Sequence, residues 1–425
     1  MRSKTKNGKY NFNYGWTFRL ADTFPLQKAL AATGDVDGQN FYEREYRESQ
    51  WKEVSLPHSF NDDDIFKNRI LDAGSSQRRT FACYRKWFKL GEVSDKKVFL
   101  EIEGIRQTCY LYVNGQLAGY YEAGSFPIGF DITEFLTDDE EQLIAIATDN
   151  TATRDIDFIS AETPNHPDAK PGTFVAPQFP NLELPEGTHA GVGYFWNCND
   201  FNPTVGGLSR NIYLHVKPKT YLTLPLYSNL KTKGVYVYAS DFDITGRKMT
   251  LNVEAEVRNE EAASCETAIA VEVYNAKGKL VKEFVGETKT LSPGETCKAF
   301  QTIIPTNAYR KTENGFEPVS EEEAGEVESD SYRVEVLKAA AAMDDVTFWD
   351  IDNPYLYQVK VKLIRNGEVV DSQEIETGFR ELSYTQEGLD VNGAKVWLTG
   401  YAQRATNEWV ALATVPDWLH YMDAK

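Results

Sequence analysis

Residues 108–121 read TCYLYVNGQLAGYY, and this stretch decides the fold class. Two runs rich in aromatic and apolar residues flank Asn114-Gly115, and both turn residues accept the positive φ angles of a tight hairpin. Working outward, strand-like runs recur at 97–103, 143–148 and 211–216 with no helical periodicity between them. Strands that recur in this way predict an all-β protein built on an antiparallel sandwich.

A second set of strands follows residue 218. Residues 249–258 alternate between apolar and polar side chains almost perfectly, and residues 267–275 alternate again. A further hairpin is predicted around Asn366-Gly367, after an acidic stretch at about 306–346. This pattern predicts a small immunoglobulin-like β-sandwich that is interrupted by a solvated acidic insertion.

The composition excludes several functional classes. The chain has 425 residues, and 45 Lys and Arg against 64 Asp and Glu give a formal net charge of −19. A protein this acidic lacks the basic face of a non-specific nucleic-acid binder or of a polybasic membrane-surface protein. No run approaches the roughly 18 apolar residues of a membrane span. Aromatic residues make up 13% of the chain, which suits both β-rich cores and the apolar faces of sugars.

Cysteine and histidine usage argues against a metal or redox protein. The five cysteines and five histidines are widely spaced, without CxxC or metal-ligand spacing. The sequence therefore predicts buried thiols, no metal site and no cofactor. The acidic run at 61–64 lacks the ligand spacing of a calcium loop, and we expect a solvated turn there. The charged start of the chain is followed by no apolar segment. Localisation stays open: periplasmic or secreted if a signal peptide was removed, otherwise cytoplasmic.

Short motifs follow one another along most of the chain. They are Trp51-x-x-Val54-x-Leu56-Pro57-His58, Tyr84-Arg85-Lys86-Trp87-Phe88, residues 99–105, Tyr112-Val113-Asn114-Gly115, residues 126–133, residues 206–214, Trp349-x-x-x-Asn353-Pro354-x-Leu356-Tyr357 and Gly378-Phe379-Arg380-Glu381. Each motif alone is weak, but together and in this order they resemble the family 2 glycoside hydrolases, the β-galactosidase and β-glucuronidase group. The resemblance covers nearly the whole chain except the insertion at 306–346.

The resemblance implies a domain order. It predicts a jelly-roll, sugar-binding-like domain at 1–218 and the immunoglobulin-like sandwich at 219–384. The truncated start of a (β/α)8 catalytic barrel would follow at 385–425. Retaining members of this family use two Glu side chains from later barrel strands, about 5–5.5 Å apart. Because a barrel takes roughly 250 residues, we expect no catalytic residue in this chain and predict that it is inactive alone.

The resemblance also suggests where substrate would be touched. The candidate substrate-binding residues are Trp196, Asp200, Asn202, Arg404, Asn407 and Glu408. A carboxylate accepts hydrogen bonds from sugar hydroxyls, a guanidinium donates several, and an indole ring can stack on a sugar. Asn407-Glu408 spells the pair that contains the family's acid/base, but it comes too early in the barrel for that role. An Asx-turn at Asp200 is the structural alternative.

Other conspicuous side chains have structural interpretations. We expect His58 to form a structural hydrogen bond, and Trp16, Trp51 and Trp87 to lie in the core.

The resemblance implies that the full-length protein is a retaining, β-galactosidase-like glycosidase that hydrolyses O-glycosyl bonds in carbohydrate metabolism. Its partner would be a β-glycoside or oligosaccharide substrate, with no nucleic acid and no membrane span. A homo-oligomer stays open. Two alternatives also stay open: a lectin-like carbohydrate-binding protein, and a purely structural β-sandwich protein without catalysis.

Overall fold

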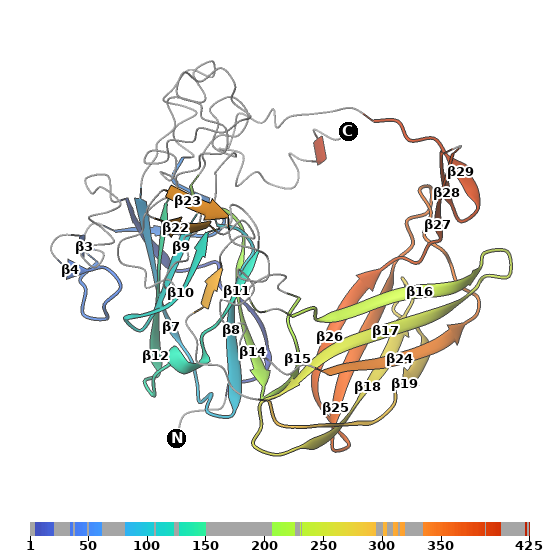
Figure 1. Cartoon of the computed structure of the whole chain (residues 1–425), viewed down its shortest axis with the longest axis horizontal. Helices are drawn as coiled ribbons and strands as arrows, with labels where there is room; N and C mark the ends of the chain where they lie inside the picture. The colour runs from blue at the N-terminus through green and yellow to red at the C-terminus, as the bar shows by residue number, and fades with distance from the viewer. Residues whose placement is uncertain are drawn as a thin grey trace. The chain divides into compact units, whose positions relative to one another are not determined.

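The computed structural model describes the chain in separate ranges. They are 5–20, 35–36, 39–48, 51–61, 81–105, 108–122, 127–149, 206–225, 230, 232–294, 301–303, 309–312, 315–318, 335–386, 388–400, 421–422 and 425. These residues fall into two compact units (Figure 1). Unit 1 contains the described residues up to Val216 and those within Lys298–Asp330 and Ala405–Lys425. Unit 2 holds those of Lys217–Cys297 and Ser331–Arg404.

Unit 1 is a sandwich of two sheets (Figure 1). The smaller sheet has the order β1-β14-β8-β11, and the larger has the order β21-β10-β9-β12-β7-β2-β5. The smaller sheet consists of β1 (Gly8–Asn11), β8 (Lys96–Ile102), β11 (Ile128–Asp131) and β14 (Ile212–Pro218). The larger consists of β2 (Trp16–Leu20), β5 (Lys52–Val54), β7 (Phe81–Lys89), β9 (Thr108–Val113), β10 (Gln116–Glu122), β12 (Glu141–Asp149) and β21 (Gln301–Ile303). Strand β21 lies parallel to β10, and the other described pairs in the two sheets are antiparallel.

Short elements complete unit 1. They are β3 (Asp35–Val36), β4 (Gln39–Asn40), β6 (His58–Ser59), β13 (Gly207–Leu208), β22 (Tyr309–Thr312), β23 (Gly315–Pro318) and the 3-10 turn η2 (Thr133–Phe135). Strand β6 pairs with β13, which brings a segment near the start of the chain against the beginning of the 206–214 motif.

The hairpin predicted at residues 108–121 is confirmed. Strands β9 and β10 pair antiparallel, with Gln116 opposite Val113. The turn residues Asn114 and Gly115 have φ angles of 49° and 86°, which only a few residue types adopt without strain.

The inner faces of the two sheets form the core of unit 1. Alternate residues of each strand point inward, and Trp16 at its centre is fully buried. Its indole N–H donates to the carbonyl oxygen of Phe12 at 2.7 Å, so the polar atom of this large side chain is satisfied inside the core. The predicted core position of Trp16 is confirmed. Trp51 is half-buried, whereas Trp87 is 38% exposed and the core prediction for it is wrong.

Unit 2 is a second sandwich. One sheet has β17 (Lys248–Asn259) at its centre, with β15 (Thr220–Leu222) and β16 (Val235–Asp243) along one side and β24 (Glu335–Met343) along the other. The other sheet has the order β19-β18-β25-β26, and β20 also pairs with β18. Its strands are β18 (Cys265–Tyr274), β19 (Leu280–Val285), β20 (Lys289–Leu291), β25 (Tyr357–Arg365) and β26 (Glu368–Thr377). The apolar residues of the alternating β17 pattern, such as Leu251 and Val253, are buried between the sheets.

The motifs at 349–357 and 378–381 meet in unit 2. The Trp349 amide donates to the Phe379 carbonyl at 2.8 Å, and the Arg380 guanidinium lies 4.6 Å from the centroid of the Trp349 ring. A side chain at Gly378 would come within 2.7 Å of the same ring. Both motifs therefore have a packing role that explains their residue types.

A small sheet follows, with the order β27 (Leu382–Thr385), β28 (Gly388–Val391) and β29 (Ala394–Val396). Of the barrel start predicted at 385–425, residues 387, 401–420 and 423–424 lie outside the described ranges, and the barrel stays a prediction. The described residues are thus all-β, arranged as two sandwiches, and the predicted fold class is confirmed at that level. Over the same ranges, none of the helices has the length and apolar character that crossing a membrane requires.

Candidate functional site

The six predicted substrate-binding residues lie outside the described residues. Trp196, Asp200 and Asn202 fall within 150–205, and Arg404, Asn407 and Glu408 fall within 401–420. Their roles stay predictions. What the structure does describe is the frame that holds both ends of the 150–205 segment. The segment leaves strand β12 after Asp149 and re-enters the fold at Gly206.

The returning end of that segment is held by buried polar groups. The Gly206 amide donates to the Asn61 side-chain oxygen at 2.8 Å, and the Gly206 carbonyl accepts from the Ser59 hydroxyl at 3.0 Å. Asn61 and Ser59 are both buried, at 0% and 2% exposure. The solvated turn predicted at 61–64 is therefore wrong for Asn61, since its amide is needed to satisfy a backbone group inside the fold. Residues 62–64 are not described.

Gly207, the next residue, tolerates no side chain. Its φ angle is 120°, outside the range that other residues adopt readily. A Cβ atom there would lie 2.6 Å from the His58 carbonyl oxygen and 2.9 Å from the Tyr84 hydroxyl. The Gly206-Gly207 signature is thus explained by the close approach of β13 to β6.

His58 lies beside this junction. Its Nδ1 atom is hydrogen-bonded to the Tyr84 hydroxyl at 2.8 Å, and its ring packs edge-on against Phe18 with centroids 4.7 Å apart. Burial, followed by the nearby charge of Lys52, lowers the pKa of His58 to about 4. The imidazole is therefore neutral at physiological pH, and the predicted structural hydrogen bond is confirmed.

The rest of the 206–214 motif joins the smaller sheet. The Asn13 side chain donates to the Asn211 side-chain oxygen at 2.9 Å and accepts from the Ile212 amide at 2.9 Å. Asn211 in turn donates to the Glu103 carboxylate at 2.8 Å. Three segments distant in sequence are tied together this way, which anchors the chain immediately after the 150–205 segment.

The outer face of the larger sheet is the second candidate site, because aromatic side chains gather on it. Cys83, Tyr110 and Ala145 point to this face, whereas their neighbours in the strands belong to the inner core. A sheet face lined with aromatic rings could stack on sugars. In this protein, however, Phe41 and Tyr46 bury themselves against it, at 1% and 7% exposure.

The residues that cover the face form the 41–48 segment. Tyr42 stacks on Tyr112 with ring centroids 4.2 Å apart and planes only 3° from parallel. Trp51 packs against Tyr46 and donates to its hydroxyl at 3.2 Å. The chain therefore places its own ring where a sugar ring would otherwise stack on Tyr112.

A buried charge holds the 41–48 segment in place. Arg85 is fully buried, and its Nε atom donates to the Glu48 carboxylate at 2.8 Å. Its Nη1 atom donates to the carbonyl oxygens of Phe41 and Glu43, the latter at 2.9 Å. The guanidinium also lies 5.2 Å from the Tyr46 ring centroid. One side chain thus binds the segment at its beginning, middle and end.

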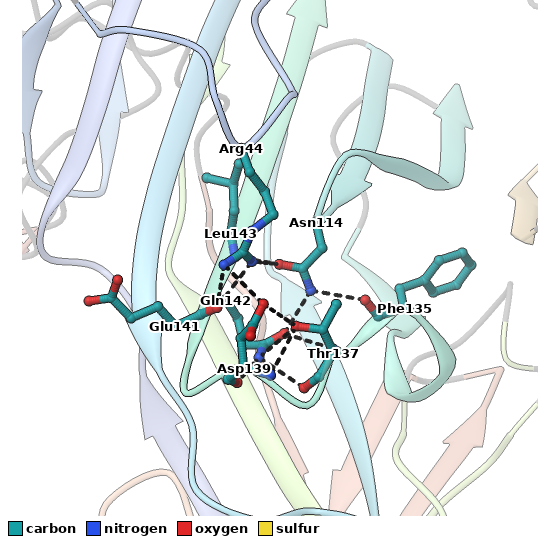
Figure 2. A network of polar contacts seen from close by, with 8 residues as sticks. All are labelled: Arg44, Asn114, Phe135, Thr137, Asp139, Glu141, Gln142 and Leu143. Atoms are coloured by element: carbon teal, nitrogen blue, oxygen red, sulfur yellow. Dashed lines mark hydrogen bonds and ion pairs between the residues drawn. The ribbon is translucent and has the colours of Figure 1, made fainter.

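Figure 2 shows a second anchor for the 41–48 segment. Arg44 donates to the Asn114 side-chain oxygen at 2.7 Å and to the Glu141 carbonyl at 3.1 Å, and it forms an ion pair with Asp139 at 3.5 Å. The Arg44 guanidinium also lies 5.0 Å from the centroid of the Trp87 ring, so the exposed indole has a cation–π partner.

Asn114 is the centre of the network in Figure 2. Its Nδ2 atom donates to the Phe135 carbonyl at 2.9 Å and to the Gln142 side-chain oxygen at 2.6 Å, while its Oδ1 atom also accepts from the Leu143 amide at 2.9 Å. The turn residue therefore links the hairpin, η2 and β12. Sequence reasoning found the turn but missed this role.

Several acidic side chains of unit 1 have defined partners within the sandwich. The acidic side chains of unit 1 named above, Glu48, Glu103 and Asp139, are each engaged in an ion pair or a hydrogen bond. Over the described ranges, no three His, Cys, Asp or Glu side chains come together in a way that could hold a metal ion. Within the part of the chain that the structure describes, these contacts hold Gly206 against β6 and the 41–48 segment against the larger sheet.

Comparison with known proteins shows which family this chain is similar to. Residues 234–380 match the model of glycosyl hydrolases family 2. The predicted resemblance to that family is confirmed. Apart from Lys298–Asp330, which belongs to unit 1, the matched range lies in unit 2, and it ends within the 378–381 motif described above.

Two curated relatives extend the family 2 similarity along the chain. A beta-glucuronidase of Formosa agariphila is 28% identical over 96% of this chain, and a beta-galactosidase of Thermoanaerobacter pseudethanolicus is 25% identical over 97%. The aligned parts cover only 33% and 41% of those relatives. The chain therefore spans about a third to two fifths of the length of these relatives.

Solved structures agree on the fold. A beta-glucuronidase from glycoside hydrolase family 2 superposes with a TM-score of 0.67 over 95% of this chain and 34% of its own, at 24% identity. A Bacteroides uniformis beta-glucuronidase superposes with a TM-score of 0.64 over 98% of this chain and 38% of its own, at 17% identity. At these identities the similarity shows the fold alone.

Proposed function

We propose that this chain is the non-catalytic N-terminal portion of a retaining β-glycosidase of the β-galactosidase and β-glucuronidase group. The observation that carries the proposal is the extent of the match. Nearly the whole chain aligns with a named beta-glucuronidase, yet it accounts for 33% of that protein's length. The two catalytic carboxylates of a retaining enzyme would then belong to the remaining part, and this chain would be inactive alone.

The described part of unit 1 supports a scaffold role within such an enzyme. Buried groups anchor the 150–205 segment at Gly206, and the segment contains Trp196, Asp200 and Asn202, which we propose as substrate contacts. Arg404, Asn407 and Glu408 are proposed contacts from the start of the barrel. A rigid frame at the end of the segment favours such contacts, because a side chain must be held within about 0.5 Å to contribute to a site.

The substrate that we propose is a terminal β-glycoside or an oligosaccharide that carries one. Neither nucleic acid nor a membrane is a partner under this proposal, in keeping with the net charge of −19. A homo-oligomer is compatible with it.

The covered sheet face favours this proposal over a lectin that binds sugars on the larger sheet of unit 1. Tyr42 stacks on the Tyr112 ring, and the buried Arg85 holds the covering 41–48 segment against the sheet. A ligand would have to displace these contacts before reaching the aromatic side chains.

The test is a pair of activity measurements. We would sequence the coding region through and beyond codon 425, then express both the 425-residue chain and any longer product. The longer protein is expected to release p-nitrophenol from a β-galactoside or a β-glucuronide, and the 425-residue chain is expected to release none. Turnover by the short chain, or a stop codon directly after codon 425, would overturn the proposal.

A further inference from the structure

The outward face of the β16–β17–β24 sheet carries an ordered row of side chains. Pairing places Tyr236 and Lys338 on opposite sides of Glu254, and Tyr238 and Ala340 on opposite sides of Asn252. The intervening residues of each strand point into the core of unit 2. These rows are therefore fixed to one surface by the register of three strands.

Tyr236 is the most prominent side chain of this surface. It is 62% exposed, although it lies in a regular strand. Its ring stacks against that of Tyr238, with centroids 5.1 Å apart and planes 24° from parallel. Tyr238 thus supports one face of the Tyr236 ring. A ring that is already ordered loses little conformational freedom when a ligand stacks on it.

Polar groups lie directly beside the two rings. The Glu254 carboxylate accepts from the Lys338 ammonium at 2.8 Å and from the Tyr238 hydroxyl at 3.5 Å. The Lys338 side chain is 67% exposed and that of Glu254 is 33% exposed, so both can also reach a ligand. The Asn252 amide donates to the Ser240 hydroxyl at 2.9 Å in the next row.

Small residues complete the surface. Ala340 and Ala342 are exposed on β24, across β17 from the tyrosines. Their short side chains leave space on the β24 side of the surface, and the polar side chains of β17 lie between this space and the tyrosine rings. The surface therefore combines an aromatic face with hydrogen-bond donors and acceptors within one short stretch of sheet.

We propose that this surface, which we call the Tyr236 platform, binds a neutral pyranose unit of a β-linked glycan. A pyranose has an apolar C–H face that stacks on an aromatic ring and hydroxyls around its edge that both donate and accept. The Glu254–Lys338 pair offers an acceptor and a donor without net charge, which suits a neutral sugar better than an anionic one. The choice of a glycan as occupant rests on the proposed function.

A protein partner fits this platform less well. The centres of protein interfaces are apolar and depleted in charge. The row beside Tyr236 instead contains the Glu254–Lys338 ion pair, which a protein would have to desolvate.

The experiment is a saturation-transfer difference NMR titration of the 425-residue chain with β-1,4-galactotetraose and with cellotetraose. We expect saturable binding of at least one of them. Tyr236→Ala is expected to weaken that binding about five- to tenfold, the value of one aromatic contact. Tyr236→Phe keeps the ring and is expected to bind as the unsubstituted chain does.

Tyr384→Ala is the matched control. Tyr384 is also an exposed tyrosine of unit 2, at 80% exposure, but it lies on β27. The same substitution there is expected to leave binding unchanged. Absence of saturable binding of either sugar, binding unaltered by Tyr236→Ala, or an equal loss in Tyr384→Ala would each overturn the inference.

The outcome is separate from that of the proposed function. Binding is measured on this chain, whereas hydrolysis is measured on the longer protein. Hydrolysis by the longer protein without sugar binding by the 425-residue chain would refute the proposed binding at the Tyr236 platform alone. Sugar binding by the 425-residue chain without hydrolysis by the longer protein would refute the proposed function alone.

Discussion

Replacing Glu48 by Ala tests whether the buried Arg85 holds the 41–48 segment on the sheet. The carboxylate accepts from Arg85 at 2.8 Å and from the Thr17 hydroxyl at 2.8 Å. Without it, the fully buried guanidinium keeps the carbonyl oxygens of Phe41 and Glu43 and the Tyr46 ring, but loses its carboxylate partner. The variant should therefore lose stability in unit 1 and loosen the covering of the sheet.

The size of the effect follows from burial. Removing one partner of a buried ion pair costs about 3–5 kcal/mol, and a hydrogen bond to a charged group is worth about 1.5–3 kcal/mol. The Glu48 side chain is 20% exposed, so water can replace part of the lost interaction. We expect a loss of about 2–3 kcal/mol, which lowers the melting temperature of a domain of this size by roughly 4–12 °C.

The assay is differential scanning calorimetry, with Arg85→Met as the second arm of a double-mutant cycle. Methionine fills much of the same volume without a charge, and Glu48→Ala in that background should cost less than about 1 kcal/mol. If Glu48→Ala destabilises unit 1 equally in both backgrounds, the pair does not hold the segment and the reasoning is refuted.

Three further predictions concern buried groups. Because burial depresses the pKa of His58 to about 4, the unfolded state takes up a proton near pH 6.5 while the folded state does not. The free energy of unfolding of unit 1 should therefore fall by up to about 3 kcal/mol from pH 6.5 to 4, and His58→Gln should flatten that part of the denaturation profile. Gly207→Ala should cost about 3 kcal/mol in urea unfolding, whereas Gly400→Ala, with no atom near its Cβ, should cost less than about 0.5 kcal/mol. Burial raises the pKa of the Cys83 and Cys109 thiols, so iodoacetamide at pH 8 should label neither in the folded protein; labelling of the native chain at either, found by peptide mapping, would contradict their burial.

Features that depend on neighbouring residues could be predicted from the sequence. The Asn114-Gly115 turn is one, because its φ angles are a local property of those two residue types. The alternation along residues 249–258 is another, because one face of β17 is buried between two sheets.

Features that depend on contacts between distant residues could not be predicted from the sequence. Nothing local shows that Asn114 bonds Arg44 and the 135–143 region, or that Asn61 is buried to bind Gly206. Trp87 was expected in the core because of its residue type, yet it points outward and meets Arg44.

One signal did point to the covered face. The run 143–148 is apolar at nearly every position, whereas a strand with one solvent-exposed face alternates between apolar and polar residues. Both faces of β12 are indeed buried, since Ile144 belongs to the inner core and Ala145 to the outer cluster. Which segment covers the outer face depends on tertiary contacts and was not predictable. The six candidate substrate contacts stay predictions, because they lie outside the described residues.

The anchoring at Gly206 has a consequence for evolution of the 150–205 segment. Its returning end is held by Ser59, Asn61 and the fit of Gly207 against β6, none of which depends on the sequence between the two ends. The anchor itself should therefore tolerate mutations, insertions and deletions between the two ends of the segment. Descendants of one scaffold could change substrate preference while their cores stay the same.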